Sequence, residues 1–315
     1  MKLKSESKKL FLKNNIQNKY LGVVSKKLLS QEFNKVIKNV QKDINDPQKT
    51  LSVLNKKFKL NFKIENLKKF KKFKTIVLIG MGGSVLGVKA IKSFLNDKIK
   101  KKIYFFDDLN SKKISNLKKK ENLNKILFIV ISKSGHTIET LSNFFSLKIA
   151  KKNSKNIIII SEKKNNILFN LVKNLNLNYI EHKNYVGGRY SVLSEVGMVP
   201  AYLMGVNIFK LRSDIVKIFR NKEIAFLKDS AIKLACLLKL KKINNLIFLN
   251  YSPKLENFLF WCQQLIAESL GKNGKGFLPV ISNAPKDHHS LLQLYLDGPK
   301  DKIFHIFSHE EESFE

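Results

Sequence analysis

The sequence predicts an α/β protein built on doubly wound parallel sheets, because strand and helix signals alternate along most of the chain. From residue 75 onward, short β-branched, apolar runs alternate with stretches of helical spacing. Two units share one form: TIVLIGMGGSVLGVKA at 75–90 and ILFIVISKSGHTIET at 126–140 each run from a strand through small residues into a helix. Loops of this kind are where parallel sheets bind anions, since backbone N–H groups at a helix N-terminus are unpaired and the helix dipole favours negative charge.

The pattern divides the chain into three predicted parts: a helical N-terminal segment at 1–70, a first domain at 71–210 and a second at 211–315. In the first domain we expect strands at 75–80, 102–106, 126–131 and 156–160, with helices at 84–96, 137–150 and 191–204. A lysine-rich stretch near 210–225 is the expected junction. In the second domain we expect strands at 244–251, 277–283 and 302–308, with helices at 255–271 and 289–296. The second domain is expected to be incomplete, because no helix pattern follows its last strand.

Charge is the anomaly of the composition. The 315 residues include 59 Lys and Arg against 25 Asp and Glu, a net charge of +34, while 43% are apolar, which argues against disorder. The lysines are spread from Lys2 to Lys302, and this favours a solvated lysine-rich surface over a dedicated nucleic-acid site. An anionic substrate would still be attracted. We therefore expect no specific nucleic-acid partner.

Cysteine spacing and hydropathy indicate the compartment. Cys236 and Cys262 have no metal or redox spacing and are expected to be buried thiols in a reducing environment. No apolar run reaches the roughly 18 residues of a membrane helix, and the first residues lack the apolar core of a signal peptide. These features predict a cytoplasmic protein without a membrane partner.

The glycine loop GMGGSVLG at 80–87 differs from the dinucleotide-binding fingerprint. That fingerprint requires glycine at its sixth position, which is Val85 here, so an NAD-dependent dehydrogenase is disfavoured. The glycines allow a ligand to approach the backbone near Gly82, with Ser84 at the helix start. Taken alone, the same residues are explained better by a tight turn with Ser84 as the helix cap.

The loop SKSGHT at 132–137 is the stronger signal. Its hydroxyls and lysine suit a tetrahedral dianion, and helix capping explains one or two of the hydroxyls but not all of them; the residues are Ser132, Lys133, Ser134 and Thr137. The Walker pattern GxxxxGK[ST] is absent, which favours a small phosphorylated metabolite over a nucleoside triphosphate.

Three further positions carry candidate chemistry, each with a structural alternative. Arg189 follows two glycines and could stabilise an oxyanion or cap a loop. Glu268 lies on an apolar helix and could act as a general base or pair with Lys272 one turn away. His289, with its neighbour His288, could move a proton or cap a helix.

Taken together and in this order, five stretches resemble the glucose-6-phosphate isomerase family, whose members contain two sugar-isomerase (SIS) domains. The stretches are IGMGGSVLG, ISKSGHTIET, VGGRYSVLSEVG, QQLIAESLGKNGKG and HHSLLQL, and they span roughly residues 75–296. The resemblance implies two SIS-type domains behind a helical N-terminal segment, and interconversion of glucose 6-phosphate and fructose 6-phosphate in glycolysis and gluconeogenesis. No metal or redox cofactor is implied.

The resemblance also implies residue roles. Glu268 would move a proton between C2 and C1, Arg189 would stabilise the cis-enediol(ate), and His289 would assist ring opening from the neighbouring subunit of a homodimer. Ser132, Lys133, Ser134 and Thr137 would hold the phosphate, and Gly82 with Ser84 would approach the sugar.

The chain departs from the family pattern at several points. His288 stands where many members have Gln, His136 replaces a small or hydroxyl residue, and Val85 stands where Asp is common. The family's C-terminal helix, with a lysine implicated in ring opening, has no counterpart, so we expect a fragment of a longer protein. Two alternatives within the fold are a bifunctional phosphoglucose/phosphomannose isomerase and a non-catalytic phosphosugar-binding protein. The second is disfavoured by the joint presence of Glu268 and His289.

Overall fold

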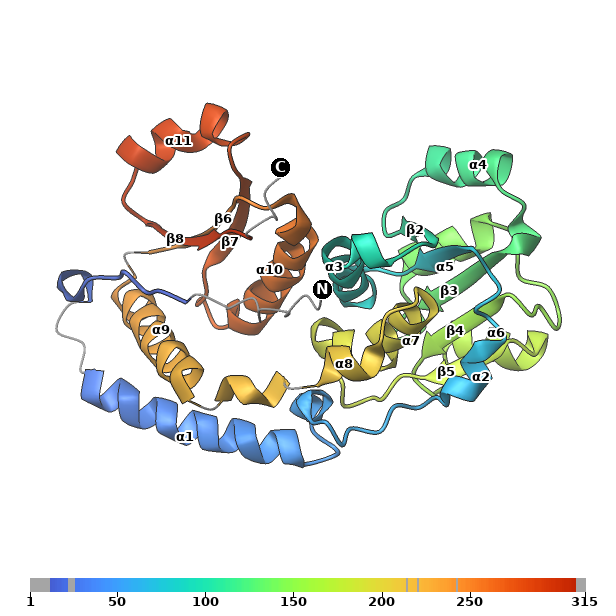
Figure 1. Ribbon diagram of the computed structural model, residues 1–315, viewed down its shortest axis with the longest axis horizontal. Coiled ribbons are helices and arrows are strands. Elements are labelled where there is room, and N and C mark those ends of the chain that lie inside the picture. Colours follow the sequence, from blue (N-terminus) through green and yellow to red (C-terminus); the bar gives the residue numbers. More distant parts are fainter. Residues whose placement is uncertain (1–11, 22–25, 214, 220, 242, 310–315) are drawn as a thin grey trace, which may run out of the picture.

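Two separate parallel sheets organise the computed structural model, which describes residues 12–21, 26–213, 215–219, 221–241 and 243–309 (Figure 1). The first sheet has the strand order β2-β1-β3-β4-β5 and the second has the order β7-β6-β8, with every neighbouring pair parallel. The strands of the first sheet are β1 Thr75–Ile79, β2 Lys102–Phe106, β3 Ile126–Ile131, β4 Ile157–Ser161 and β5 Asn178–Glu181. Those of the second are β6 Asn245–Asn250, β7 Leu278–Asn283 and β8 Lys302–Phe307.

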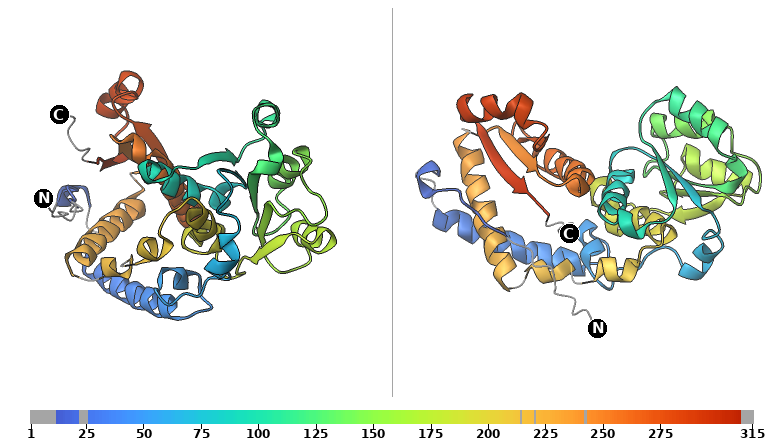
Figure 2. Two further views of the ribbon diagram at one scale, coloured as in Figure 1. Left: turned by 45° about the vertical axis from the view of Figure 1, so that its right-hand side comes forward. Right: turned by 45° about the horizontal axis from the view of Figure 1, so that its top comes forward.

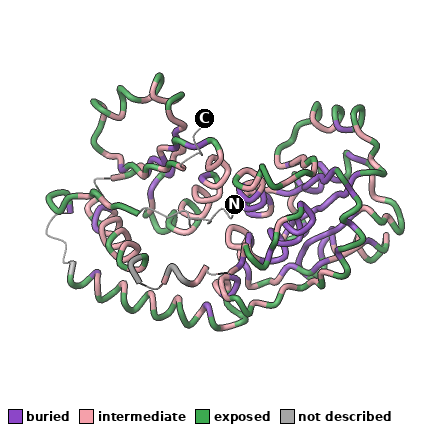
Figure 3. Tube along the Cα trace, viewed as in Figure 1, coloured by how far each residue is buried: buried purple, intermediate pink, exposed green. Residues whose placement is uncertain are grey.

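The three inner strands of the first sheet are buried along their whole length. Continuous apolar runs such as ILFIVI form strands of this kind when helices cover both faces of a parallel sheet. Side chains alternate between the faces, so that Ile76 and Leu78 join one core cluster while Val77 and Ile79 join another. Figure 3 shows that burial is concentrated in this part of the molecule.

Most of the helices that surround these sheets have at least nine residues, and shorter helices and helical turns connect them. The helices around the first sheet are α2 Ile64–Lys68, α3 Leu86–Phe94, α4 Ser111–Lys120, α5 Ile138–Ser146, α6 Ile167–Leu175, α7 Glu195–Leu203 and α8 Ile208–Arg212; α2 and α8 are the short ones. The rest are α1 Lys26–Asn45, α9 Asn221–Leu240, α10 Glu256–Leu270 and α11 His288–Asp297. Every residue of α7 is buried, which makes it the central helix of the larger unit.

Helix α10 joins the two units. It packs against α3 of the first unit and against β7 of the second, and both views in Figure 2 place it beside α3. The indole of Trp261 on α10 packs on the core of the first sheet, whereas Leu259 on the opposite side belongs to the core of the second. The N-terminal helix α1 packs against α9, and its Leu29 joins that second core.

The predicted α/β class with parallel sheets is confirmed, and three elements differ from expectation. The strand β5 was not predicted, because it has four residues and polar ends, Asn178 and Glu181. Helix α9 begins at Asn221, inside the stretch expected to be a junction, because apolar residues recur at helical spacing from Ile224 onward. The predicted helix at 191–204 begins instead as the 3₁₀ turn η6, Gly188–Leu193, and continues as α7. The domain boundaries at 70 and 210 stay a prediction.

Candidate functional site

The strand order of the first sheet changes direction between β1 and β3. The chain passes from β1 to β2 on one side and then crosses to β3 on the other, so the loops that follow β1 and β3 diverge at the carboxyl edge of the sheet. Ligands bind at such a topological switch point in open α/β sheets. The two loops at this point are the sequence-predicted glycine loop, which begins at Gly80, and the hydroxyl-rich loop, which begins at Ser132.

The glycine loop is packed against the loop that carries Arg189. A Cβ on Gly83 would lie 2.3 Å from the carbonyl carbon of Gly188 and 2.6 Å from the backbone nitrogen of Arg189, so only glycine permits this approach. The hydroxyl of Ser191 donates to the carbonyl of Gly83 at 3.3 Å. The exposed Gly82 has a φ of +50°, and Ser84 next to it is half-buried.

Arg189 and Glu268 meet beside this loop, although they lie on different units. The guanidinium Nη1 of Arg189 is 3.1 Å from Oε2 of Glu268, and its Nε donates to the hydroxyl of Ser269 at 3.0 Å. The indole N–H of Trp261 donates to the backbone carbonyl of Arg189 at 2.8 Å, and the guanidinium stacks on the ring of Tyr190. The arginine is therefore held in place, whereas the Glu268 side chain is 49% exposed and accessible from solvent.

Gln264 is a site residue that the sequence reasoning missed. Its Nε2 donates to Oε1 of Glu268 at 2.7 Å, and the same nitrogen would lie 3.0 Å from a Cβ on Gly82. Its own Oε1 is buried and has no hydrogen-bond partner in the part of the chain that the structure describes. The available signal was its position one helical turn before Glu268, where side chains at i and i+4 are neighbours.

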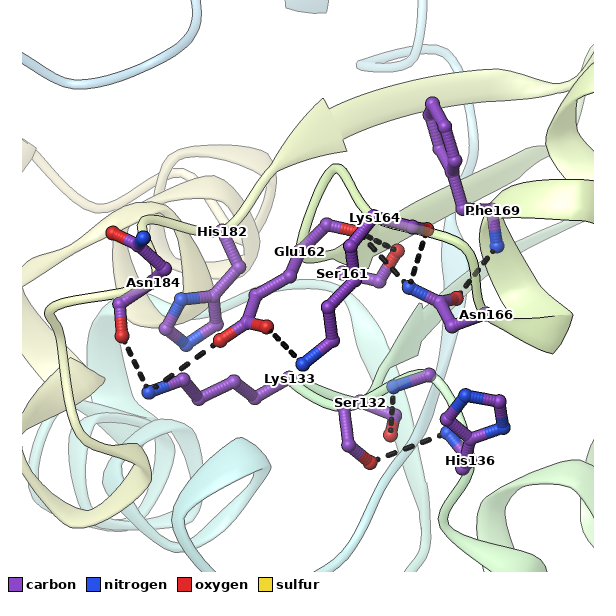
Figure 4. A network of polar contacts seen from close by, with 12 residues as sticks. Ser132, Lys133, His136, Ser161, Glu162, Lys164, Asn166, Phe169, His182 and Asn184 are labelled. Carbon is purple, nitrogen blue, oxygen red and sulfur yellow. Dashed lines mark hydrogen bonds and ion pairs between the residues drawn. The ribbon is translucent and has the colours of Figure 1, made fainter.

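The hydroxyl-rich loop is shaped partly by its own hydrogen bonds (Figure 4). The hydroxyl of the buried Ser132 lies 2.8 Å from that of Thr137 and accepts from the N–H of Gly135 at 3.1 Å. The exposed Ser134 accepts from the N–H of His136 at 3.2 Å. Because the Thr137 side chain does not cap α5, the first N–H groups of this helix remain open to an anion.

Gly135 allows the loop after β4 to pack closely against the hydroxyl-rich loop. Gly135 has a φ of +71°, and a Cβ there would lie 1.9 Å from Oδ1 of Asn166. Asn166 caps α6 by accepting from the N–H of Phe169 at 2.8 Å. The hydroxyl-rich loop and the loop after β4 are therefore fixed against each other.

Lys133 points out of the loop toward the ends of β4 and β5. Its Nζ donates to the backbone carbonyl of Asn184 at 2.7 Å and lies 3.6 Å from a carboxylate oxygen of Glu162 (Figure 4). Lys133 is thus beside the loop hydroxyls in sequence, but its ammonium group has partners of its own.

The structure brings Glu268 and Arg189 together but leaves His289 apart from them. The crossovers β6–β7 and β7–β8 run in opposite directions, so right-handed connections place α10 and α11 on opposite faces of the second sheet. His289, in the first turn of α11, is exposed, and no hydrogen bond joins it to Arg189 or Glu268 among the described residues. Its neighbour His288 lies 3.3 Å from the hydroxyl of Tyr251.

The N-terminal segment braces the loop that carries Arg189. The hydroxyl of Thr50 donates to the carbonyl of Tyr185, and the N–H of Asn61 donates to Oε1 of Glu195 at 2.7 Å. Glu195 is fully buried at the start of α7, and this burial raises the pKa of its carboxyl group. Residues of the N-terminal segment therefore help to set the position of the site.

Because His182 is buried, we expect the stability of the protein to fall at acidic pH. It is 2% exposed, its Nδ1 lies 2.9 Å from the carbonyl of Lys183, and burial lowers its pKa from 6.5 to about 4. The unfolded chain therefore takes up the proton first: stability is complete above pH 6.5 and falls as the pH drops toward 4, by about 2 kcal/mol at pH 5. Urea unfolding at pH 7.5 and pH 5 should show this loss in the native chain and a smaller one in His182→Gln. Equal losses would contradict the assignment.

No group of three or more His, Cys, Asp or Glu side chains in the described part of the chain is arranged to hold a metal ion. None of the helices in that part of the chain is both long and apolar enough to cross a bilayer.

Comparison with known proteins gives a consistent result. The family model described as phosphoglucose isomerase matches residues 1–278. The chain is 38% identical over 263 residues to a glucose-6-phosphate isomerase of Methanocaldococcus jannaschii, covering 76% of this chain and 62% of that protein. It is 36% identical over 242 residues to a glucose-6-phosphate isomerase of Campylobacter jejuni, covering 73% of this chain and 59% of that protein. Each match therefore spans about three fifths of the relative's length.

A solved structure shares the fold. The crystal structure of a hypothetical protein from Thermus thermophilus superposes with a TM-score of 0.69 at 26% identity, covering 89% of this chain and 72% of that one.

Proposed function

Because the chain belongs to the phosphoglucose isomerase family, we propose that it interconverts glucose 6-phosphate and fructose 6-phosphate. The observation that carries this proposal is the pairing of Arg189 with Glu268 beside the glycine loop, with Nη1 and Oε2 3.1 Å apart. Aldose–ketose isomerisation requires a base next to the acidic C–H and a cation near the developing oxyanion. Both groups are present, and both side chains are partly exposed to solvent.

The proton transfer is assigned to Glu268. Its carboxylate takes the proton from C2 of the open-chain aldose, the C1 carbonyl oxygen takes up the negative charge, and a cis-enediol(ate) forms. The C2 hydroxyl then gives up its proton while the C1 oxygen takes one up, and returning the carbon-bound proton to C1 leaves a carbonyl at C2, so the ketose forms and the base is regenerated. Arg189 stabilises the oxyanion, and its bond to Ser269 supports this role because a fixed cation needs no reorganisation during the reaction.

Substrate binding is assigned to the two loops at the switch point. The phosphate lies at the N-terminus of α5, near the exposed Ser134 and the hydroxyl of Thr137, with Ser132 shaping the loop beneath it and Lys133 at its side. The sugar passes along Gly82 and Ser84. The unpartnered Oε1 of Gln264 supports an additional contact, since a buried acceptor is stabilised by a donor such as a sugar hydroxyl.

A coupled assay tests the activity. Fructose 6-phosphate is supplied to the chain, and the glucose 6-phosphate formed is oxidised by a dehydrogenase that reports on it by absorbance. Turnover well above the protein-free rate is expected. Binding of fructose 6-phosphate without turnover would instead assign the chain as a phosphosugar-binding protein.

A homodimer with shared sites is part of the proposal. His289 is exposed and lies on the opposite face of the second sheet from α10, which supports its donation to the site of a neighbouring subunit. Co-expression of Glu268→Gln with His289→Asn should restore activity that neither variant has alone, because one site of each mixed dimer then has both native residues. Mixed dimers as inactive as either variant would refute shared sites.

We place the activity in the cytoplasm, in glycolysis and gluconeogenesis. Both cysteines are free thiols in the structure: Cys236 is fully buried, whereas Cys262, expected to be buried as well, is half-buried, and desolvation still raises its pKa to about 12. Inert thiols of this kind support a reducing compartment. Three parts, at 1–70, 71–210 and 211–315, remain the proposed domain organisation, supported by a first sheet that lies within 75–181 and a second within 245–307.

A further inference from the structure

The carboxylate of Glu162 is one of the partners of Lys133. Glu162 follows β4 directly and is 8% exposed, with Oε1 3.6 Å from the ammonium of Lys133 and Oε2 2.5 Å from that of Lys164. In Figure 4, Lys133 extends toward Glu162 and Asn184, away from His136 in the hydroxyl-rich loop, which is the proposed phosphate loop. A single buried carboxylate thus has two lysine partners, and only one of them belongs to the phosphate loop.

Glu162 cannot easily follow Lys133 if that side chain moves. Its backbone N–H donates to the carbonyl of Lys133 at 3.0 Å, and its own carbonyl accepts from Nδ2 of Asn166 at 3.0 Å. Asn166 is in turn packed against Gly135. The backbone around Glu162 is therefore tied to the phosphate loop, while the long Lys133 side chain can rotate about its own bonds.

We propose that Glu162 is an internal counter-ion for Lys133 that the substrate's phosphate displaces, and that it thereby sets the affinity of the site for phosphorylated ligands. The inference rests on the function proposed above. On binding, the Lys133 ammonium leaves Glu162 and the carbonyl of Asn184 and pairs with the phosphate. Glu162 is a positioning residue in this scheme and does not touch the substrate.

The exchange is feasible because it leaves no buried charge unpaired. A carboxylate that loses its partner inside a protein is strongly destabilised. Here Lys164 stays at 2.5 Å and continues to neutralise Glu162, while the pair that is broken is the longer one, at 3.6 Å. A phosphate group with a charge near −2 attracts an ammonium more strongly than a single carboxylate does, so the exchange favours phosphorylated over neutral sugars.

Calorimetric titration with fructose 6-phosphate, and separately with inorganic phosphate, tests the inference. Glu162→Gln removes the competing charge and should lower the Kd for both ligands by roughly two- to fivefold, the size expected for a partly exposed ion pair. Glu162→Asp, which keeps the charge but shortens the side chain, should give a smaller change in the same direction. An unchanged or higher Kd in folded Glu162→Gln would overturn the inference, because Glu162 would then support Lys133 rather than compete with it.

Two controls separate this effect from charge in general. Glu121→Gln changes the net charge equally and also frees a lysine, Lys102, which lies 2.6 Å from Glu121 at the start of β2, the opposite edge of the sheet. Its Kd values should equal those of the native chain. In a Lys133→Met background, Glu162→Gln should no longer tighten binding; tightening that persists there would also overturn the inference.

The outcomes distinguish the inference from the proposed function. Failure of the native chain to bind fructose 6-phosphate would overturn both. Binding by the native chain, with no tightening in Glu162→Gln, would overturn the inference alone and leave the isomerase assignment intact.

Discussion

Replacing Glu268 by Gln is expected to lower kcat for fructose 6-phosphate isomerisation by about a thousandfold, the scale on which a positioned general base contributes. The substitution keeps the shape of the side chain and its place beside Arg189 and Gln264, but a neutral amide cannot accept the C2 proton. Binding of fructose 6-phosphate should persist, because the hydroxyl-rich loop that we propose as the phosphate site lies on the first unit and is not altered. The coupled assay measures kcat, and calorimetry measures the Kd.

The matched control is Glu223→Gln, which removes the same charge from an exposed position on α9. It should leave both kcat and the Kd unchanged. Retention of more than about a tenth of the native kcat in Glu268→Gln would assign the base to another group, since the loss would then be smaller than general-base catalysis normally supplies. A loss of binding as well as turnover would mean that the ion pair with Arg189 is needed to form the site.

Sequence patterns predicted the parts of the site that depend on local geometry. A buried strand followed by small residues and a helix places its loop at the carboxyl edge of a parallel sheet, and this located the loops at Gly80 and Ser132 before any contact was known. The sequence likewise indicated Arg189 and Glu268 as candidate site residues, because a charged residue beside glycines or on an apolar helix is unusual. Roles for these residues came only from the order of several motifs together.

Contacts between distant segments could not be predicted from the sequence, because hydrophobic periodicity indicates which face of a helix or strand is buried but not which other element covers it. Arg189 and Glu268 are 79 positions apart, and their contact depends on how α10 packs on α3. The partner of Glu268 expected from helical spacing was Lys272, yet tertiary packing supplied Arg189. In the same way, Glu162 reads as one polar residue among several after β4, and only the fold shows that it faces Lys133.

Gly83→Ala is expected to damage both the stability of the protein and the alignment of the site. The added Cβ would meet the carbonyl carbon of Gly188 at 2.3 Å, its oxygen at 2.4 Å and the nitrogen of Arg189 at 2.6 Å. These are backbone atoms, so no side-chain rotation relieves the overlap and the two loops must separate. Overpacking of this kind costs about 1–3 kcal/mol, and the displaced Arg189 would no longer align with Glu268. Both the free energy of unfolding and kcat should fall.

Gly188→Ala is the control for Gly83→Ala, because Gly188 is the residue that Gly83 contacts. A Cβ on Gly188 has no atom within 4 Å, so this variant should keep native stability to within about 0.5 kcal/mol and keep most of its activity. Urea unfolding and the coupled assay on both variants would separate a steric requirement at position 83 from a general intolerance of the glycine loops. If the two variants behave alike, the close approach of Gly83 to Gly188 does not determine the position of Arg189. If only Gly83→Ala loses activity, the alignment of Arg189 with Glu268 depends on a contact between two backbones, one from each side of the site.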